Sequence, residues 1–94
     1  MEIRIRLLGT FKEFSEEAIC LRYEKEPDLG EVIDRLVLEL GPAFERAFLD
    51  PILHDPSPRA LILVNGVEIG VLRGLETTLS EGDDVVVLPV SHGG

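Results

Sequence analysis

The sequence closes with Leu79-Ser-Glu-Gly-Asp-Asp-Val-Val-Val-Leu-Pro-Val-Ser-His-Gly-Gly94, which puts a glycine turn, an apolar strand and a short tail in direct succession. From Val85 to Val90, polar and apolar residues do not alternate. Such a run is typical of a strand that is covered on both faces, or of one whose outer face waits for a partner. We therefore expect a β-strand here, followed directly by the tail.

Three earlier stretches also predict strands. The stretch from Ala60 to Val64 is apolar at every position and precedes the turn Asn65-Gly66. The stretches from Glu2 to Leu8 and from Ala18 to Tyr23 alternate, which is the period-two pattern of a half-buried strand. Between these two, the segment from Phe11 to Glu17 predicts a loop.

One amphipathic helix is predicted between the second and third strands. Asp28 is placed as its N-cap, with Glu31 as the acidic partner of a capping box. Apolar residues then recur at three- and four-residue steps up to Leu40. Gly41 ends this helix, and Pro42 suits the first turn of a short second one.

The predicted order of elements describes one α+β domain, a mixed sheet of about four to five strands packed on one main helix. One helix covers only one sheet face, so the outer apolar residues of the last two strands predict an exposed interface patch. The alternative is that the short helix, or the surface loop from Asp50 to Arg59, covers them. We expect the domain to span residues 1–90 and a flexible tail to span 91–94.

Composition narrows the classes of partner. The 94 residues include 18 acids and 9 bases, a formal charge of −9, which disfavours nucleic acid and membranes and favours a basic surface of another protein. No apolar run reaches the ~20 residues of a membrane helix, and the N-terminus is unlike a signal peptide, so we expect a soluble, cytoplasmic protein. A lack of Gln, with one Asn and one Cys, points to a thermophilic source.

The residues with reactive side chains show no machinery of a free-standing enzyme. Cys20 is the single cysteine, so disulfide frameworks and cysteine-rich metal sites are excluded. It lies mid-strand without a local feature that would activate a thiolate, so an inert cysteine is favoured over a sulfur-carrying thiol. His54 stands in a polar loop, where a solvated side chain is favoured over a general base. Phosphate-binding glycine loops and catalytic triads are absent.

The tail offers chemistry to another protein instead. Extended, residues 89–94 reach about 20 Å beyond the fold, and Gly93-Gly94 is narrow enough to thread a channel that side chains would block. A free carboxylate is a poor electrophile, because resonance and charge resist attack. A partner must therefore first convert it to an acyl adenylate with ATP. The alternative is a frayed terminus without a role.

Four stretches of the chain share the pattern of a known family, namely Leu7-Leu8-Gly9, Pro27-Asp-Leu-Gly-Glu31, Val64-Asn-Gly66 and the C-terminal block quoted above. On these motifs the chain resembles, over nearly its whole length, the small, sulfur-carrier subunit of molybdopterin synthase (MoaD-like). The wider superfamily of that subunit includes the ThiS-like carriers and the archaeal and eukaryotic ubiquitin-like modifiers. The resemblance implies a β-grasp, ubiquitin-like fold.

The resemblance also implies partners and site residues. An adenylating, ubiquitin-activating-like enzyme would activate Gly94, and a sulfur donor enzyme would supply the sulfur of a thiocarboxylate. The large subunit of molybdopterin synthase would then receive the tail, with Gly93 allowing the fit. The chain itself would bind no cofactor or metal and would act as a non-catalytic donor subunit, while the activating partner consumes ATP. The implied partner-binding residues are Ile62, Val64, Val85, Val87, Pro89, Val90, Ser91 and His92.

The sequence departs from the MoaD-like pattern at two places, and two other functions stay open. The tail has one proline and the extra residue His92 where the family ends Pro-Pro-Val-x-Gly-Gly, and the segment from Gly41 to Arg59 is longer than in compact members. This segment also argues against a thiamine sulfur carrier.

One open alternative is a modifier joined through Gly94 to lysines of target proteins. The other is an interaction domain with an unreactive tail.

Overall fold

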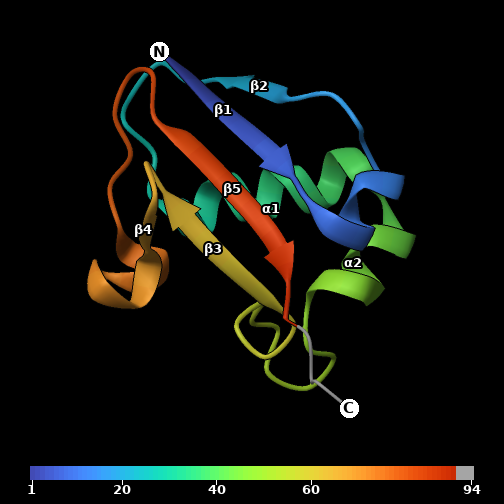
Figure 1. The fold of residues 1–94 in the computed structure, drawn as a ribbon. Coiled ribbons are helices and arrows are strands. Elements are labelled where there is room, and N and C mark those ends of the chain that lie inside the picture. The colour runs from blue at the N-terminus through green and yellow to red at the C-terminus, as the bar shows by residue number, and fades with distance from the viewer. Residues whose placement is uncertain (91–94) are drawn as a thin grey trace.

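The computed structural model describes residues 1–90 as a mixed sheet packed on helices (Figure 1). The strands are β1 (Glu2–Leu7), β2 (Ile19–Arg22), β3 (Ala60–Val64), β4 (Val67–Glu68) and β5 (Asp84–Pro89). Their order in the sheet is β2-β1-β5-β3-β4. β1 and β5 are parallel, whereas the other neighbouring strands are antiparallel. The predicted α+β class and mixed sheet are confirmed.

The main helix α1 (Leu29–Leu40) begins and ends where local signals predict. Oδ1 of Asp28 accepts a hydrogen bond from the Glu31 N–H at 2.8 Å, and Oε1 of Glu31 accepts one from the Asp28 N–H at 3.3 Å. The capping box therefore satisfies two backbone donors at the helix start. Gly41, with a φ of 94°, ends the helix. No helix among the described residues is long and apolar enough to cross a membrane.

The second helix α2 (Pro42–Phe48) buries Phe44 and Phe48 beside an element that the sequence did not predict. A 3₁₀ helix over Gly9–Glu13 occupies the start of the predicted loop from Phe11 to Glu17. Its Phe11 is buried, and its ring meets Phe44 and Phe48 edge to face, with centroids 5.9 and 6.0 Å apart. These contacts form between residues distant in sequence, so local periodicity does not show them.

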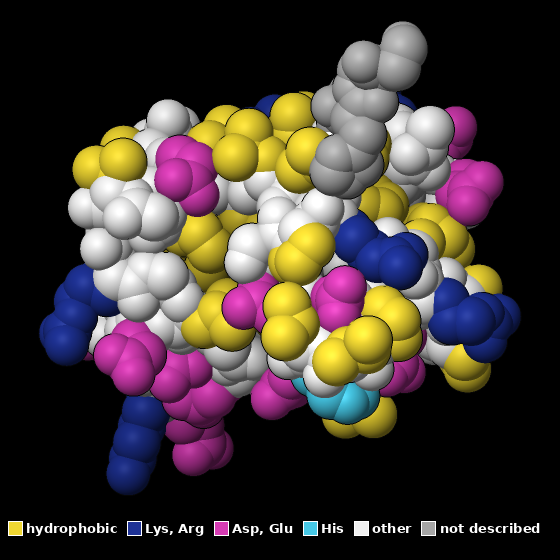
Figure 2. All heavy atoms as spheres, turned by 90° about the horizontal axis from the view of Figure 1, so that it is seen from below, with side chains coloured by type: hydrophobic (Ala, Val, Ile, Leu, Met, Phe, Trp, Pro, Cys, Tyr) yellow, Lys and Arg dark blue, Asp and Glu magenta, His cyan; other side chains and the backbone are white. Residues whose placement is uncertain are grey.

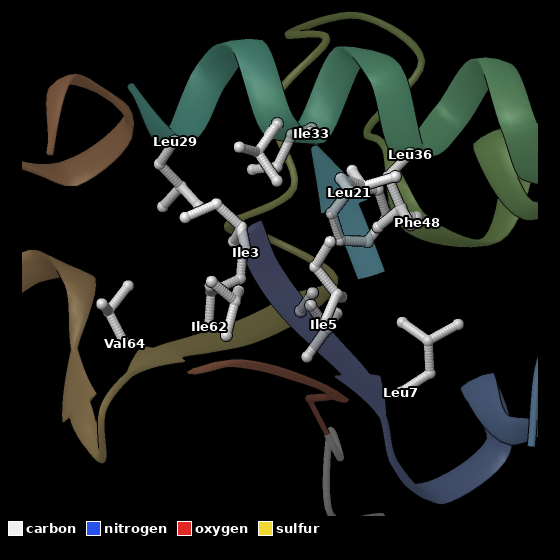
Figure 3. Close-up of a cluster of buried hydrophobic side chains, with 14 of the residues drawn as sticks. Ile3, Ile5, Leu7, Leu21, Leu29, Ile33, Leu36, Phe48, Ile62 and Val64 are labelled. Atoms are coloured by element: carbon white, nitrogen blue, oxygen red, sulfur yellow. The ribbon is translucent and has the colours of Figure 1, made fainter. Parts of the chain in front are cut away.

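The core lies between the sheet and α1 (Figure 3). The side chains drawn from β1 and β3 point toward those from α1, and Leu79 is fully buried among this cluster. Burying a large aliphatic side chain contributes about 1.5–3 kcal/mol relative to leaving it exposed. The sheet is therefore fixed to α1 through one face.

The opposite face of the sheet has no helix over it within residues 1–90. Figure 1 shows α1 behind the sheet, with α2 and the loop from Asp50 to Arg59 at its lower end. Leu61 on β3 and Arg4 on β1 are exposed on the outer face. Of the outer apolar residues of the last two strands, Leu61 is exposed, Leu63 and Leu88 are half-buried and Val86 is buried, so the predicted exposed patch is confirmed in part.

Candidate functional site

The C-terminal strand β5 lies in the middle of the sheet and carries the chain to its tail. The Leu8 N–H donates to the carbonyl of Val87 at 2.8 Å, on the β1 side. On the β3 side, the Val90 N–H donates to the carbonyl of Arg59 at 3.0 Å. Because both neighbours hold this strand, the position of Val90 is fixed by the whole sheet.

The register of β3 and β5 decides which of their side chains are available. Ile62 lies opposite Val87, and Val64 lies opposite Val85. All four face α1 and are buried, with exposed fractions between 1% and 6%. Successive side chains on a strand point to opposite faces, so these residues belong to the core. The prediction that Ile62, Val64, Val85 and Val87 bind partners is corrected accordingly.

Their neighbours in sequence form the outer apolar surface. Leu61 lies opposite Leu88, and Leu63 lies opposite Val86. We call Leu61, Leu63, Val86 and Leu88 the outer strip. Leu61 is 37% exposed, whereas Val86, in the middle of the sheet, is 8% exposed. This strip runs toward the end of β5 and is the apolar surface that a partner of the sheet face would meet.

Charged side chains border the outer strip on the β1 side. The register aligns Arg4 with Asp84 and Arg6 with Val86, so both arginines share the outer face. Nε of Arg6 donates to Oδ1 of Asp84 at 3.1 Å, and a second bond joins Nη2 to Oδ2. The hydrogen bonds and the charge of Asp84 raise the pKa of Arg6 above its ordinary value. The face is therefore apolar at β3 and along β5 after Asp84, and charged at β1 and Asp84.

Comparisons with known proteins give the family. No protein-family model matches the chain. Small archaeal modifier protein 3 of Haloferax volcanii is 32% identical to it over 95 residues, and the match covers all of both chains. The chain belongs to the small archaeal modifier family.

Solved structures support the same ubiquitin-like β-grasp fold. Small archaeal modifier protein 1 of Methanosarcina acetivorans matches with a TM-score of 0.79 at 26% identity, over 99% of this chain and 96% of that one. Molybdopterin-converting factor of Helicobacter pylori, solved as a complex of its subunits 1 and 2, matches with a TM-score of 0.61 at 22% identity, over 100% of both chains. The second likeness concerns the fold alone.

In this small archaeal modifier family member, the remaining predicted site residues cluster at the chain's end. Pro89 is half-buried, and Val90 is 38% exposed. Ser91, His92, Gly93 and Gly94 lie outside the described residues. Beside the end of β5 is a hollow, which we call the tail-base hollow. It is lined by residues that include Phe11, Ala47, Asp50, Arg59, Pro89 and Val90.

The reactive side chains that the sequence set aside are not brought together. Cys20 is exposed on β2 and aligned with Arg4 of β1, whereas His54 lies in the loop between α2 and β3. Within residues 1–90, no group of three or more His, Cys, Asp or Glu side chains could hold a metal ion.

Sequence reasoning predicted an outer apolar patch on β3 and β5 but assigned the wrong residues to it, because both strands are apolar at nearly every position. A signal was present in β1, where Arg4 and Arg6 alternate with buried Ile3 and Ile5. That alternation marks the solvent face of β1 only. To place Val86 on this solvent face, one needs the register between β1 and β5. This register cannot be read from the sequence.

Proposed function

We propose that this protein is a sulfur carrier whose Gly94 is adenylated and converted to a thiocarboxylate that donates sulfur to molybdopterin dithiolene formation. The observation that carries the proposal is the central strand β5, which ends next to a tail of sequence Ser-His-Gly-Gly. Membership of the small archaeal modifier family supports this proposal, as does the fold shared with a chain of the Helicobacter pylori molybdopterin-converting factor complex.

The chemistry divides between this chain and its partners. A carboxylate oxygen of Gly94 attacks the α-phosphorus of ATP on the adenylating enzyme, and pyrophosphate leaves. Hydrosulfide supplied by the donor enzyme then attacks the acyl carbon and loses its proton, and AMP leaves with the oxygen that joined it to the acyl group. One carboxylate oxygen is thereby replaced by sulfur. This chain supplies the acyl group and the docking surface, and the large synthase subunit accepts the sulfur.

The outer strip is the proposed docking surface for these partners, together with Pro89, Val90, Ser91 and His92. It takes the place of the buried residues first assigned to this role. The exposed part of this apolar strip gains free energy when a partner removes it from water. ATP-dependent activation also fits the cytoplasmic location that the sequence predicts.

A modifier function is supported to a comparable degree, because the Haloferax relative is named a small archaeal modifier protein. In this reaction the Nζ of a target lysine attacks the same acyl adenylate, AMP leaves and an isopeptide bond forms. The carrier and modifier functions share one activated intermediate and are compatible in one protein. Lys12 and Lys25 are the only lysines of this protein, so few acceptor sites exist for conjugating one copy of it to another.

Intact-mass spectrometry tests the carrier function. The chain is incubated with the adenylating enzyme of its own organism, ATP and a sulfur donor, and a mass increase equal to oxygen replaced by sulfur is expected at Gly94. The control is a chain lacking Gly94, which should stay unmodified. An unmodified intact chain in the presence of an enzyme that activates other carriers would overturn the proposal.

Immunoblots of native extract test the modifier function. A tagged chain that is a modifier gives a ladder of conjugates that resist boiling in detergent and reducing agent, and the ladder disappears when Gly94 is deleted. A dedicated carrier gives one band at the mass of the free chain. Mapping the conjugated lysines by mass spectrometry then identifies the targets.

A further inference from the structure

The loop between α2 and β3 presents two large apolar side chains to solvent. Ile52 is 84% exposed and Leu53 is 66% exposed. We call this pair the Ile52–Leu53 knob. Exposed apolar side chains of this size, when adjacent and rimmed by polar residues, mark sites of protein interaction.

Hydrogen bonds within the loop hold the knob in place. Oδ1 of Asp50 accepts from the N–H groups of Ile52 and Leu53 at 2.9 and 2.8 Å. The backbone carbonyl of Asp50 accepts a hydrogen bond from the His54 N–H at 2.9 Å. The backbone N–H of Asp50 donates one to the carbonyl of Asp55 at 3.0 Å. The loop therefore closes on itself at Asp50. A preorganised loop loses less conformational entropy on binding than a free one.

The knob lies on the end of the molecule from which the tail leaves. A second hollow contains Leu49, Pro51 and His54 beside the knob, and it shares Asp50 and Arg59 with the tail-base hollow. The Arg59 carbonyl also holds the N–H of Val90. Figure 2 views this end, where hydrophobic side chains lie among acidic and basic ones. A protein that receives the tail must therefore approach the knob.

A cation, Arg59, lies between the knob and the end of β5. Arg59 lines both hollows, and its Nη1 donates to the carbonyl of Arg46 at 3.1 Å, which positions the guanidinium. On a chain of net charge −9, this end offers two neighbouring arginines to a partner. The complementary surface is an apolar recess with a carboxylate at its border.

We propose that the Ile52–Leu53 knob enters an apolar recess, bordered by a carboxylate facing Arg59, on the enzyme that adenylates Gly94. This inference rests on the proposed function and adds a second contact to it, separate from the outer strip. Both the carrier and the modifier function require adenylation by this enzyme. The contact would therefore be used in either function. The knob acts in binding and touches no reacting atom.

ATP–pyrophosphate exchange by the adenylating enzyme tests the knob with the full-length chain as the varied substrate. Ile52→Asp and Leu53→Asp are each expected to raise the KM for the chain about tenfold and to leave kcat unchanged, because uniform binding is lost. The matched control is Val71→Asp, since Val71 is 77% exposed in the 3₁₀ helix Ile69–Val71 and lines neither hollow. Melting temperatures of all three variants should equal that of the unmodified sequence.

A separate variant tests the contribution of the Arg59 charge to binding. Arg59→Gln is expected to raise the KM and to reduce its dependence on salt, because an ion pair with the enzyme's carboxylate is lost. An unchanged salt dependence would remove the carboxylate from the proposal.

The outcomes separate the two proposals. If exchange depends on Gly94 but the Ile52→Asp and Leu53→Asp variants keep the normal KM, or lose kcat alone, the knob contact is overturned and the carrier function stands. If the unmodified chain supports no exchange with an enzyme that is active on other carriers, the proposed function fails and the knob contact fails with it.

Discussion

Gly9 and Pro89 approach so closely that the second residue after β1 must lack a side chain. A Cβ built on Gly9 would lie 2.9 Å from Cδ and 3.0 Å from Cγ of Pro89, and Gly9 has a φ of +59°. The contact joins the turn after β1 to the end of β5. The base of the tail therefore depends on a glycine that lies far from it in the sequence.

Replacing Gly9 tests this relationship. Gly9→Ala is expected to lower the free energy of unfolding by about 1–3 kcal/mol, because it combines a strained φ with a clash against Pro89. Gly74→Ala is the matched control, since Gly74 has a φ of +56° with nothing within 4 Å of the built Cβ. Urea unfolding measures both variants. Equal losses would mean that the approach to Pro89 contributes nothing.

Adjacent residues of β3 should separate stability from binding. Ile62→Ala removes a buried side chain and is expected to lower the free energy of unfolding by about 2–5 kcal/mol. Leu61→Ala, on the outer face, should change it by less than about 1 kcal/mol and weaken binding to the adenylating enzyme. Urea unfolding and titration calorimetry provide the two readouts. A large stability loss for Leu61→Ala together with none for Ile62→Ala would reverse the assignment of faces.

The capping box of α1 gives a smaller, local prediction. Asp28→Ala is expected to lower the free energy of unfolding by about 1 kcal/mol, because the Glu31 N–H loses its acceptor. Asp34→Ala removes an exposed carboxylate of the same helix that is outside the cap, and it serves as the control. Chemical denaturation with both variants checks the difference between them.

The Asp50 carboxylate makes the stability of the loop that carries the knob depend on pH. Backbone hydrogen bonds from Leu53 and then Ile52 lower the pKa of Asp50 below its ordinary value of 3.8. Since the folded pKa is the lower one, this stabilisation is fully present above the ordinary value and is lost as pH falls through the folded pKa. An NMR titration of the Asp50 carboxyl should give a midpoint below 3.8. A midpoint at or above that value would show that the loop is not closed on Asp50 in solution.

The acid limb of the stability curve supplies an independent check. Asp50→Asn removes the titrating group, so stability should fall less between the ordinary and the folded pKa than it does in the unmodified chain. Asp34→Asn, which removes an exposed carboxylate of α1, is the matched control. Thermal unfolding from pH 5 downward measures the effect.

Several features were predictable because their causes are local. The N-cap at Asp28, the break at Gly41 and Pro42 and the alternation of β1 each depend on residues within a few positions of one another. The 3₁₀ helix at Gly9–Glu13 was not predictable in this way. It is stabilised by the packing of Phe11 on aromatic rings of α2, which lie more than 30 residues further along the chain.

The sequence by itself determined where β1, β2, β3, β5 and α1 lie, but not β4, and it determined that one helix covers one sheet face and that an acidic domain ends in a tail with two glycines. Only the tertiary structure decided that Leu61 faces out while Ile62 faces in, and that the hollow beside the Ile52–Leu53 knob shares Arg59 with the hollow at the end of β5. The physical reason is that a strand that is apolar at every position has no preferred face of its own. Pairing with β1 and packing on α1 choose that face, and both are contacts between distant parts of the chain.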